Sequence, residues 1–179
     1  MNIVEKARIF ATQKHGEIDH RRKYTNEPYI NHPAAVVDIL RSINHSDTML
    51  AVAWLHDTVE DTNTTNTEIL NNFGVEVLAG VDWLTDKYAD PKLGNREIRK
   101  FLERQRFFNA PTWVKTVKLA DLIDNSRSIL QHDKGFAATY LVEKQNLLNA
   151  LTNGDDFLFE TASNIVRDAL KEIGLNSAT

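Results

Sequence analysis

The sequence predicts an all-α protein, folded as one helical bundle over residues 1–179. Apolar residues recur at intervals of three and four, which is the spacing of one helix face. Val and Ile seldom alternate with polar residues, as they would in a half-buried strand. The sequence has no repeat of solenoid length and no low-complexity stretch, so a single domain is the simplest interpretation. A short hairpin within residues 16–30 is also compatible with the pattern.

Local signals mark the first three helices. The first carries apolar residues at Ile3, Ala7, Phe10 and Ala11. Pro33 suits the first turn of the second helix, where its missing N–H leaves no helix bond unmade. Asp47 is the expected N-cap of the third helix. That helix is strongly apolar over residues 49–55 and is expected to run to the His56-Asp57 pair.

The later helices are separated by polar or helix-breaking residues. Gly74 is expected to end a short helix, and Pro111 is expected to open a long one. Asn153 and Gly154 separate the last two. Beyond Gly74, the expected helices occupy roughly residues 75–85, 95–110, 111–123, 136–151 and 155–173.

Composition limits the compartment and the chemistry. The 179 residues are 42% hydrophobic and 26% charged, which are ordinary values for a globular protein. There is no cysteine, which excludes disulfides, thiolate zinc sites and a cysteine nucleophile. No apolar run approaches the ~20 residues that span a bilayer, and the first turns are too charged for a signal peptide. We therefore expect no membrane association and a cytoplasmic location.

The net charge of −4 limits the partners. Non-specific binding to long nucleic acid needs a broad basic surface, which 21 Lys and Arg against 25 Asp and Glu do not indicate. A small anionic ligand needs only a local basic cluster, and Arg21, Arg22 and Lys23 form one. The sequence thus favours a small-molecule partner, and it indicates no oligomeric state.

The densest group of chemically active side chains lies at the end of the apolar third helix. His56 and Glu60 are four residues apart, as are Asp57 and Asp61, so each pair would share a face of a continuing helix. Burying several ionisable groups there is costly without a compensating charge. A divalent metal ion is the simplest source of that charge, and a solvated helix end is the ordinary alternative.

His32 and Asp121 are further candidates for metal ligands. His32 lies just before a helix opens, and Asp121 follows an apolar helical stretch. Each alone has an ordinary explanation as a capping or packed polar residue. Two imidazoles and two carboxylates suit Mn²⁺, Fe²⁺ or Zn²⁺, and the oxygen ligands favour Mn²⁺ or Fe²⁺. There is no His-Glu-x-x-His motif, and the single Glu-x-x-His that begins at Glu17 is interpreted as loop.

In order and spacing, His32, the His56-Asp57 pair and Asp121 match the H…HD…D pattern of the HD-domain superfamily. The surrounding sequence motifs are more specific: RKY at residues 22–24, EPYINHP at 27–33, HDTVEDT at 56–62, FG at 73–74, LTD at 84–86 and VKLAD at 117–121, followed by Asn125. They resemble the hydrolase domain of RelA/SpoT-type proteins, in particular the stand-alone small alarmone hydrolases, which include metazoan-type ppGpp hydrolases. The resemblance is strongest from residue 3 to about residue 151.

The resemblance implies removal of the 3′-pyrophosphate of ppGpp or pppGpp, which yields GDP or GTP and pyrophosphate. In the family, the Glu-Asp pair after the HD pair acts on the attacking water, which here assigns Glu60 and Asp61. A carboxylate one turn beyond a ligand can orient or deprotonate water whose pKa a metal lowers. Glu60 is our first choice for water activation, with Asp61 as its partner. The resemblance also implies one Mn²⁺ bound by His32, His56, Asp57 and Asp121.

Substrate contacts are implied in the same way. Arg22 and Lys23 match basic residues that approach the base and phosphates of the nucleotide. A guanidinium can stack on a purine, and an ammonium can neutralise phosphate. Further candidates, each with a surface or packing role as its alternative, are Asn125, Arg127, Tyr140 and Lys118.

Three functions are compatible with these residues. The leading one is a Mn²⁺-dependent alarmone pyrophosphohydrolase. The second keeps the same chemistry but acts on another nucleotide ester, for example as an NADPH phosphatase. The third is a nucleotide-sensing module that binds without turnover. The presence of both the ligands and the water-activating carboxylates argues against the third, because a pure binder need not keep both.

Overall fold

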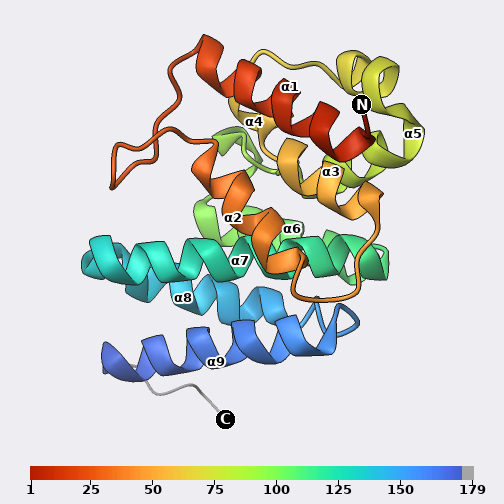
Figure 1. The fold of residues 1–179 in the computed structure, drawn as a ribbon. Coiled ribbons are helices and arrows are strands. Elements are labelled where there is room, and N and C mark those ends of the chain that lie inside the picture. The colour runs from red at the N-terminus through yellow and green to blue at the C-terminus, as the bar shows by residue number, and fades with distance from the viewer. Residues whose placement is uncertain (175–179) are drawn as a thin grey trace. The chain divides into compact units, whose positions relative to one another are not determined.

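The computed structural model describes residues 1–174, and this part of the chain is helical (Figure 1). The prediction of an all-α protein is therefore confirmed. The described residues contain no strand. An isolated antiparallel bridge joins Arg21 and Pro28, within the segment 16–30 where a short hairpin was also compatible with the sequence. The α-helices are α1 (Ile3–Glu17), α2 (Asn31–Leu40), α3 (Asp47–Leu55), α4 (Thr58–Asp61), α5 (Asn66–Leu84), α6 (Arg96–Phe108), α7 (Thr112–His132), α8 (Lys134–Leu148) and α9 (Asp156–Glu172), with a 3₁₀ helix η1 (Pro91–Leu93).

The chain divides into two compact units. The first is Met1–Asp86, which contains α1 to α5, and the second is Lys87–Thr179, whose described part contains η1 and α6 to α9. Two contact-dense units also occur within one domain, so the single-domain interpretation of residues 1–179 stays a prediction.

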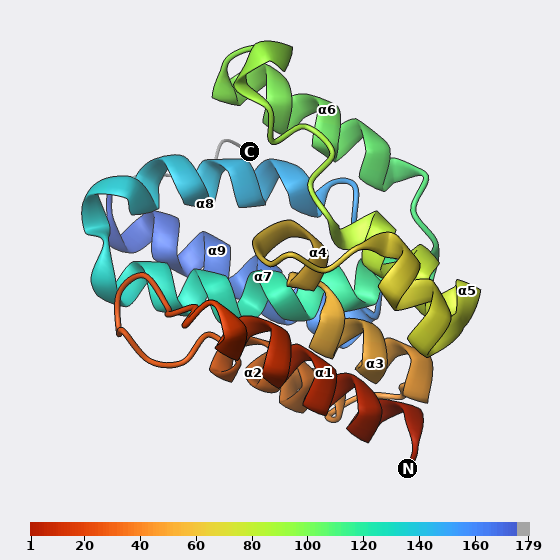
Figure 2. The same cartoon turned by 90° about the horizontal axis from the view of Figure 1, so that it is seen from above.

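Helix α3 lies at the centre of the first unit. It contacts α1, α2 and α5, and α1 runs alongside it in Figure 2. Every residue from Met49 to Leu55 is buried, because these neighbours cover several faces of the helix. A helix that is apolar all round suits this position. Each large apolar side chain buried there stabilises the fold by about 1.5–3 kcal/mol, so α3 is a firmly packed base for the residues that follow it.

The end of α3 differs from the sequence prediction of a continuing helix. The helix stops at Leu55, and α4 begins at Thr58. Side chains take over the last carbonyl groups, since His56 Nδ1 donates to the Ala53 oxygen at 2.8 Å and Thr58 Oγ1 donates to the Leu55 oxygen at 2.7 Å. These bonds satisfy acceptors that a helix end leaves without backbone partners, which explains why the helix can break here.

Caps and one glycine set other helix limits. Ser46, not Asp47, is the N-cap of α3, because Ser46 has the extended backbone of a cap and its hydroxyl accepts from the Met49 N–H at 3.2 Å. Asp47 instead lies in the first turn, where its charge suits the positive end of the helix. Gly74 has φ 84° and ψ 174°, so it interrupts α5 as the sequence predicted.

In the second unit α7, α8 and α9 contact one another pairwise, and α6 contacts α8. Asp155 caps α9 by accepting a hydrogen bond from the Leu158 N–H at 3.0 Å, at the helix start that the sequence predicted. Gly154 lies in a tight place, since an added Cβ would be 2.6 Å from Leu119 Cδ1. Among the described helices, none combines the length and the apolar character that crossing a bilayer requires.

Candidate metal centre

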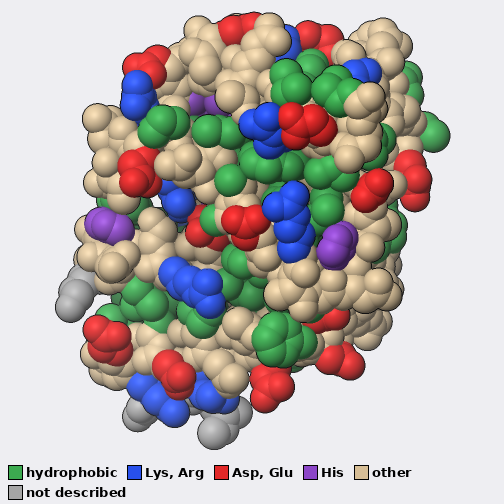
Figure 3. All heavy atoms as spheres, in the orientation of Figure 1, with side chains coloured by type: hydrophobic (Ala, Val, Ile, Leu, Met, Phe, Trp, Pro, Cys, Tyr) green, Lys and Arg blue, Asp and Glu red, His purple; other side chains and the backbone are tan. Residues whose placement is uncertain are grey.

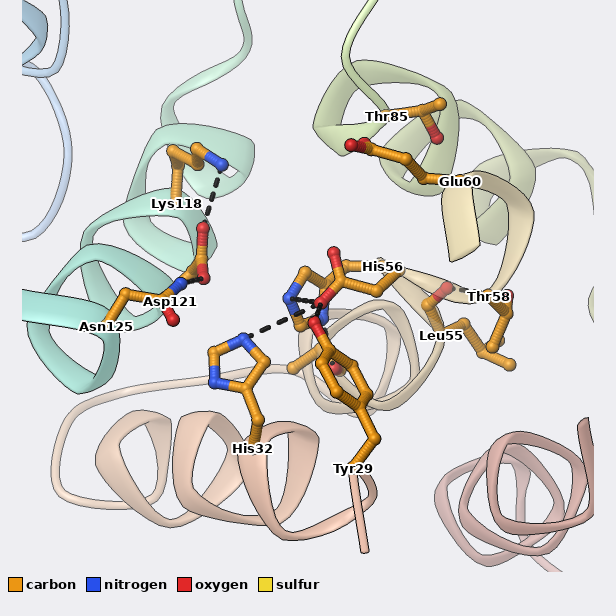
Figure 4. A network of polar contacts seen from close by, with 12 residues as sticks. Tyr29, His32, Leu55, His56, Thr58, Glu60, Thr85, Lys118, Asp121 and Asn125 are labelled. Carbon is orange, nitrogen blue, oxygen red and sulfur yellow. Dashed lines mark hydrogen bonds and ion pairs between the residues drawn. The ribbon is translucent and has the colours of Figure 1, made fainter. Parts of the chain in front are cut away.

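His32, His56 and Asp57 come together within the first unit (Figure 4). His32 lies in the first turn of α2, His56 directly follows α3, and Asp57 directly precedes α4. One ligand atom from each residue lies within 4.8 Å of the others. The Nε2 atoms of His56 and His32 lie 3.0 Å and 3.6 Å from the same oxygen, Oδ2 of Asp57. The fold thus brings three of the four predicted metal ligands to one point.

The backbone of α3 fixes the tautomer of His56. A carbonyl oxygen only accepts hydrogen bonds, so His56 Nδ1 carries the hydrogen that it shares with the Ala53 carbonyl at 2.8 Å. In the neutral ring the lone pair is then on Nε2, which faces Asp57 Oδ2 at 3.0 Å. Two acceptor atoms at this distance repel each other unless a proton or a metal ion lies between them. The geometry therefore fits a bound cation.

Burial strengthens the requirement for positive charge. His32 and His56 are 2% and 1% exposed, and the Asp57 side chain is 18% exposed. A carboxylate largely removed from water is stable only when opposite charge and hydrogen bonds compensate for the lost hydration. A divalent ion bound by two imidazoles and a carboxylate supplies such charge. These three residues form the candidate metal centre.

Tyr29 adds a contact that reasoning from the sequence missed. Its hydroxyl donates a hydrogen bond to Asp57 Oδ2 at 2.5 Å, across 28 positions of the chain (Figure 4). The one sequence feature that could have indicated a role for Tyr29 is that it lies in the same EPYINHP motif as His32. Nothing in the residue pattern indicates Asp57 as its partner, because the contact depends on how the loop before α2 packs.

Glu60 and Asp61 lie on α4, directly after the HD pair. Glu60 Oε2 accepts a hydrogen bond from the backbone N–H of Asp86 at 2.9 Å, which restrains its side chain. Both residues are exposed, so they are accessible to water. Partial desolvation of the Asp61 carboxylate, together with the negative charges of Asp57 and Glu60, raises the pKa of Asp61 to about 7. A carboxyl group with such a pKa can both accept and donate a proton at neutral pH.

Asp121 lies on α7 in the second unit and is 5% exposed. Lys118 Nζ donates to its Oδ2 at 2.8 Å, and the Asn125 amide donates to its Oδ1 at 2.6 Å. Lys118 and Asn125 precede and follow Asp121 by three and four residues, so all three share one face of the helix. Two candidate substrate residues therefore orient this carboxylate, as hydrogen-bond donors commonly do for carboxylates that bind metals.

The other predicted substrate residues belong to different units. Arg22 and Lys23 lie on the loop between α1 and α2; Arg22 is half-buried, and Lys23 Nζ lies 3.2 Å from the Tyr24 hydroxyl. Arg127 is exposed on α7. Burial raises the pKa of Tyr140 on α8, so its hydroxyl stays protonated at neutral pH. Their contacts with a nucleotide stay predictions.

Lys144 is a charged residue of the second unit that no sequence motif indicates. It lies on α8, with its Nζ 4.7 Å from the centroid of the Tyr140 ring. Burial, with the like charges of Lys118 and Lys100, lowers the pKa of Lys144 to about 8. The three lysines come from α6, α7 and α8, so their mutual influence depends on tertiary packing that no local motif encodes.

A model of the HD domain matches residues 7–153, which is most of the chain. The chain belongs to the HD-domain family. Curated relatives of this HD-family chain include the guanosine-3′,5′-bis(diphosphate) 3′-pyrophosphohydrolase of Xenopus tropicalis, which is 40% identical over 129 residues, covering 71% of this chain and 69% of the relative. The GTP pyrophosphokinase of Brucella ovis is 33% identical over 139 residues, covering 74% of this chain, which spans 18% of that relative's length.

A solved structure is similar to the HD-family chain over nearly its whole length. It aligns with a TM-score of 0.82 and 26% identity, covering 98% of this chain and 97% of that one. It is described as a metazoan ortholog of SpoT that hydrolyses ppGpp and plays a role in starvation responses. This likeness, with the family match, confirms the resemblance to RelA/SpoT-type hydrolases that the sequence motifs indicated.

Proposed function

We propose that this HD-family chain is a metal-dependent phosphohydrolase that removes the 3′-pyrophosphate of ppGpp or pppGpp. Water is added across the bond between the ribose 3′ oxygen and the pyrophosphate, which gives GDP or GTP and pyrophosphate. The observation that carries the proposal is the convergence of His32, His56 and Asp57 on one point. It occurs in a chain that is 40% identical to a relative named for this reaction.

We propose Mn²⁺ as the bound ion, with Fe²⁺ or another divalent transition metal as a substitute. Two imidazoles with carboxylate oxygens suit such borderline ions. Asp121 is proposed as the fourth ligand on the H…HD…D sequence pattern, supported by its burial and by its two hydrogen-bond donors. When bound, the ion supplies positive charge that polarises a phosphate oxygen and makes water more acidic.

Glu60 and Asp61 are proposed to act on the attacking water. Glu60 is accessible to solvent and is restrained by the Asp86 N–H, so it can orient a water molecule and accept its proton. Asp61, whose raised pKa is about 7, is suited to take that proton on or to return it to the leaving ribose oxygen. The assignment of Glu60 as the base and Asp61 as its partner rests on this difference.

The substrate is proposed to be a small nucleotide. Arg22 is assigned to the guanine base and Lys23 to a phosphate, since a guanidinium stacks on purines and an ammonium neutralises phosphate. Asn125, Arg127 and Tyr140 are assigned to the ribose and phosphates. In Figure 3 acidic and basic side chains are interspersed across the face that is drawn, rather than gathered by sign.

Product release from ppGpp with added Mn²⁺ tests the proposal. Wild type is compared with Asp57→Ala, which removes a metal ligand, and with Glu60→Ala, which removes the proposed base. Glu160→Ala serves as the control, because it removes an exposed carboxylate from α9. We expect GDP and pyrophosphate from wild type and from the control, and a loss of at least about 100-fold in the other two variants.

Other products would assign another function. Orthophosphate from NADPH, with no product from ppGpp, would keep the metal chemistry but change the ester. Nucleotide binding without any product would indicate a sensing module and contradict the hydrolase.

A further inference from the structure

We infer that Tyr29 is a positioning residue that holds the carboxylate of Asp57 and ties it to the loop carrying Arg22 and Lys23. The proposed function gives Tyr29 no role, so the inference goes beyond it. It also rests on that function, because Asp57 is a metal ligand there. All of these residues lie in the first unit.

The contact between Tyr29 and Asp57 is short and meets a shared atom. The Tyr29 hydroxyl donates at 2.5 Å to Oδ2 of Asp57, the oxygen on which His56 Nε2 and His32 Nε2 converge. This donated bond limits rotation of the carboxylate, so the remaining lone pairs keep their direction toward the imidazoles. Hydrogen-bond donors that orient a ligating carboxylate in this way commonly change metal affinity by about 10- to 100-fold.

Two histidines hold the ring of Tyr29. The His20 ring is stacked on it, with centroids 3.8 Å apart and planes inclined by 8°. His15 lies 4.8 Å from the Tyr29 ring centroid, and its Nδ1 is 3.0 Å from Nδ1 of His20. Because His15 is 2% exposed and lies in the last turn of α1, which packs on α3, the stack connects Tyr29 to the core of the unit.

The backbone closes the loop at the same place. The Tyr29 N–H donates to the His20 carbonyl at 3.0 Å, and the His20 N–H donates to the His15 carbonyl at 3.0 Å. Within the loop, the Arg22 N–H donates to the Glu27 carbonyl at 2.9 Å. The two ends of the loop therefore meet at the stack of His20 on Tyr29. Tyr29 lies at the base of this loop and hydrogen-bonds Asp57 of the candidate metal centre, so a displacement of the loop is transmitted to Asp57.

Mn²⁺ titration of the metal-free chain tests the contact with Asp57. Tyr29→Phe removes the hydroxyl but keeps the ring that stacks on His20. We expect the Kd for Mn²⁺ to rise by about 10- to 100-fold, while the metal-free variant still unfolds in one cooperative thermal transition. The Kd decides the role at Asp57, because Tyr29 also hydrogen-bonds Asp61 and turnover of ppGpp would report both contacts. Tyr88→Phe, which removes a phenol hydroxyl from the second unit, should leave the Kd unchanged.

Substitution of His20 tests the tie to the loop. His20→Ala removes the stacked ring, so we expect it to raise both the Kd for Mn²⁺ and the KM for ppGpp several-fold. His20→Phe keeps an aromatic ring in the stack, and both of its constants should lie closer to the wild-type values than those of His20→Ala.

Each outcome bears on a different statement. An unchanged Kd in Tyr29→Phe would overturn the positioning role. A His20→Ala variant with wild-type KM would overturn the tie to the loop. If wild type binds no divalent ion at all, the proposed metal centre fails and the inference fails with it. That result appears before any substitution is made, so the two failures are distinguishable.

Discussion

The Ala53 carbonyl keeps the hydrogen of His56 on Nδ1, so the lone pair on Nε2 faces the carboxylate of Asp57. Neighbouring groups likewise distinguish Asp61, whose pKa is raised to about 7 chiefly by partial desolvation, from an ordinary exposed aspartate. Individual residues of the same type thus acquire different chemistry from their partners.

Glu60→Gln separates proton transfer from binding. The substitution keeps the size of the side chain and an oxygen that can accept from the Asp86 N–H, but it removes the base. We expect kcat for ppGpp to fall by about 10²- to 10⁴-fold, while the Kd for Mn²⁺ stays close to that of wild type. Steady-state kinetics with a parallel metal titration measure both. Wild-type kcat in this variant would transfer the role of base to Asp61.

His15 makes stability depend on pH. Burial is the main reason that its pKa is lowered from 6.5 to about 4. Between these pH values His15 is protonated in the unfolded chain but neutral in the folded chain. The free energy of unfolding therefore falls as the pH falls from 6.5 toward 4. The full change in the free energy of unfolding that His15 causes is on the order of 3 kcal/mol. Above this window His15 is neutral in both the folded and the unfolded chain, so the free energy of unfolding no longer depends on its protonation.

Denaturant unfolding at several pH values between 7 and 4.5 measures this effect. Wild type should lose stability more steeply over this window than His15→Asn, which cannot titrate at this position. Equal slopes in the two proteins would show that His15 is not responsible.

At the scale of the elements, several helix limits followed from local signals in the sequence, although the N-cap of α3 is Ser46 and not the expected Asp47. Asn95 caps α6, Asp155 caps α9 and Gly74 interrupts α5, and each of these signals acts within a few residues. The break after Leu55 was not predicted, since the helix was expected to reach His56 and Asp57. It depends on hydrogen bonds from side chains to the carbonyl groups of the preceding turn, and the apolar pattern contains no trace of them.

Gly74→Ala should destabilise α5. The glycine has φ 84°, a conformation that residues with a Cβ adopt only under strain, although open space surrounds the site of that Cβ. We expect a loss of about 1–3 kcal/mol in the free energy of unfolding. Gly16→Ala is the matched control, since Gly16 lies within α1 with no atom near its added Cβ. The control should be neutral or stabilising by up to about 1 kcal/mol, and equal effects in the two variants would contradict the backbone explanation.

At the scale of the whole molecule, the all-α class and the HD family could be predicted from the sequence. So could the meeting of His32 with His56 and Asp57, because the family pattern encodes it. The contacts of Tyr29 and Lys144 could not, because they join residues from different elements through packing alone. The metal ligands are therefore easier to find from sequence than the residues that orient them.

Metal removal should lower the stability of the chain. The proposed ion joins the start of α2 to the turn between α3 and α4, so it binds the folded state and not the unfolded one. At a Mn²⁺ concentration 100-fold above the Kd, the gain is about 2.7 kcal/mol. Thermal unfolding with and without a chelator measures it. Asp57→Ala should show no such difference, and a chelator effect of wild-type size in that variant would place the ion elsewhere.

The most direct test is a Mn²⁺ titration of the chelator-stripped protein, with pyrophosphate release from ppGpp and bound metal measured in the same samples. We expect no turnover in the stripped protein and a rate that rises in proportion to occupancy, reaching its maximum at one ion per chain. Full pyrophosphate release without metal, or saturation with Mn²⁺ and no pyrophosphate, would contradict the account of this chain as a metal-dependent ppGpp pyrophosphohydrolase.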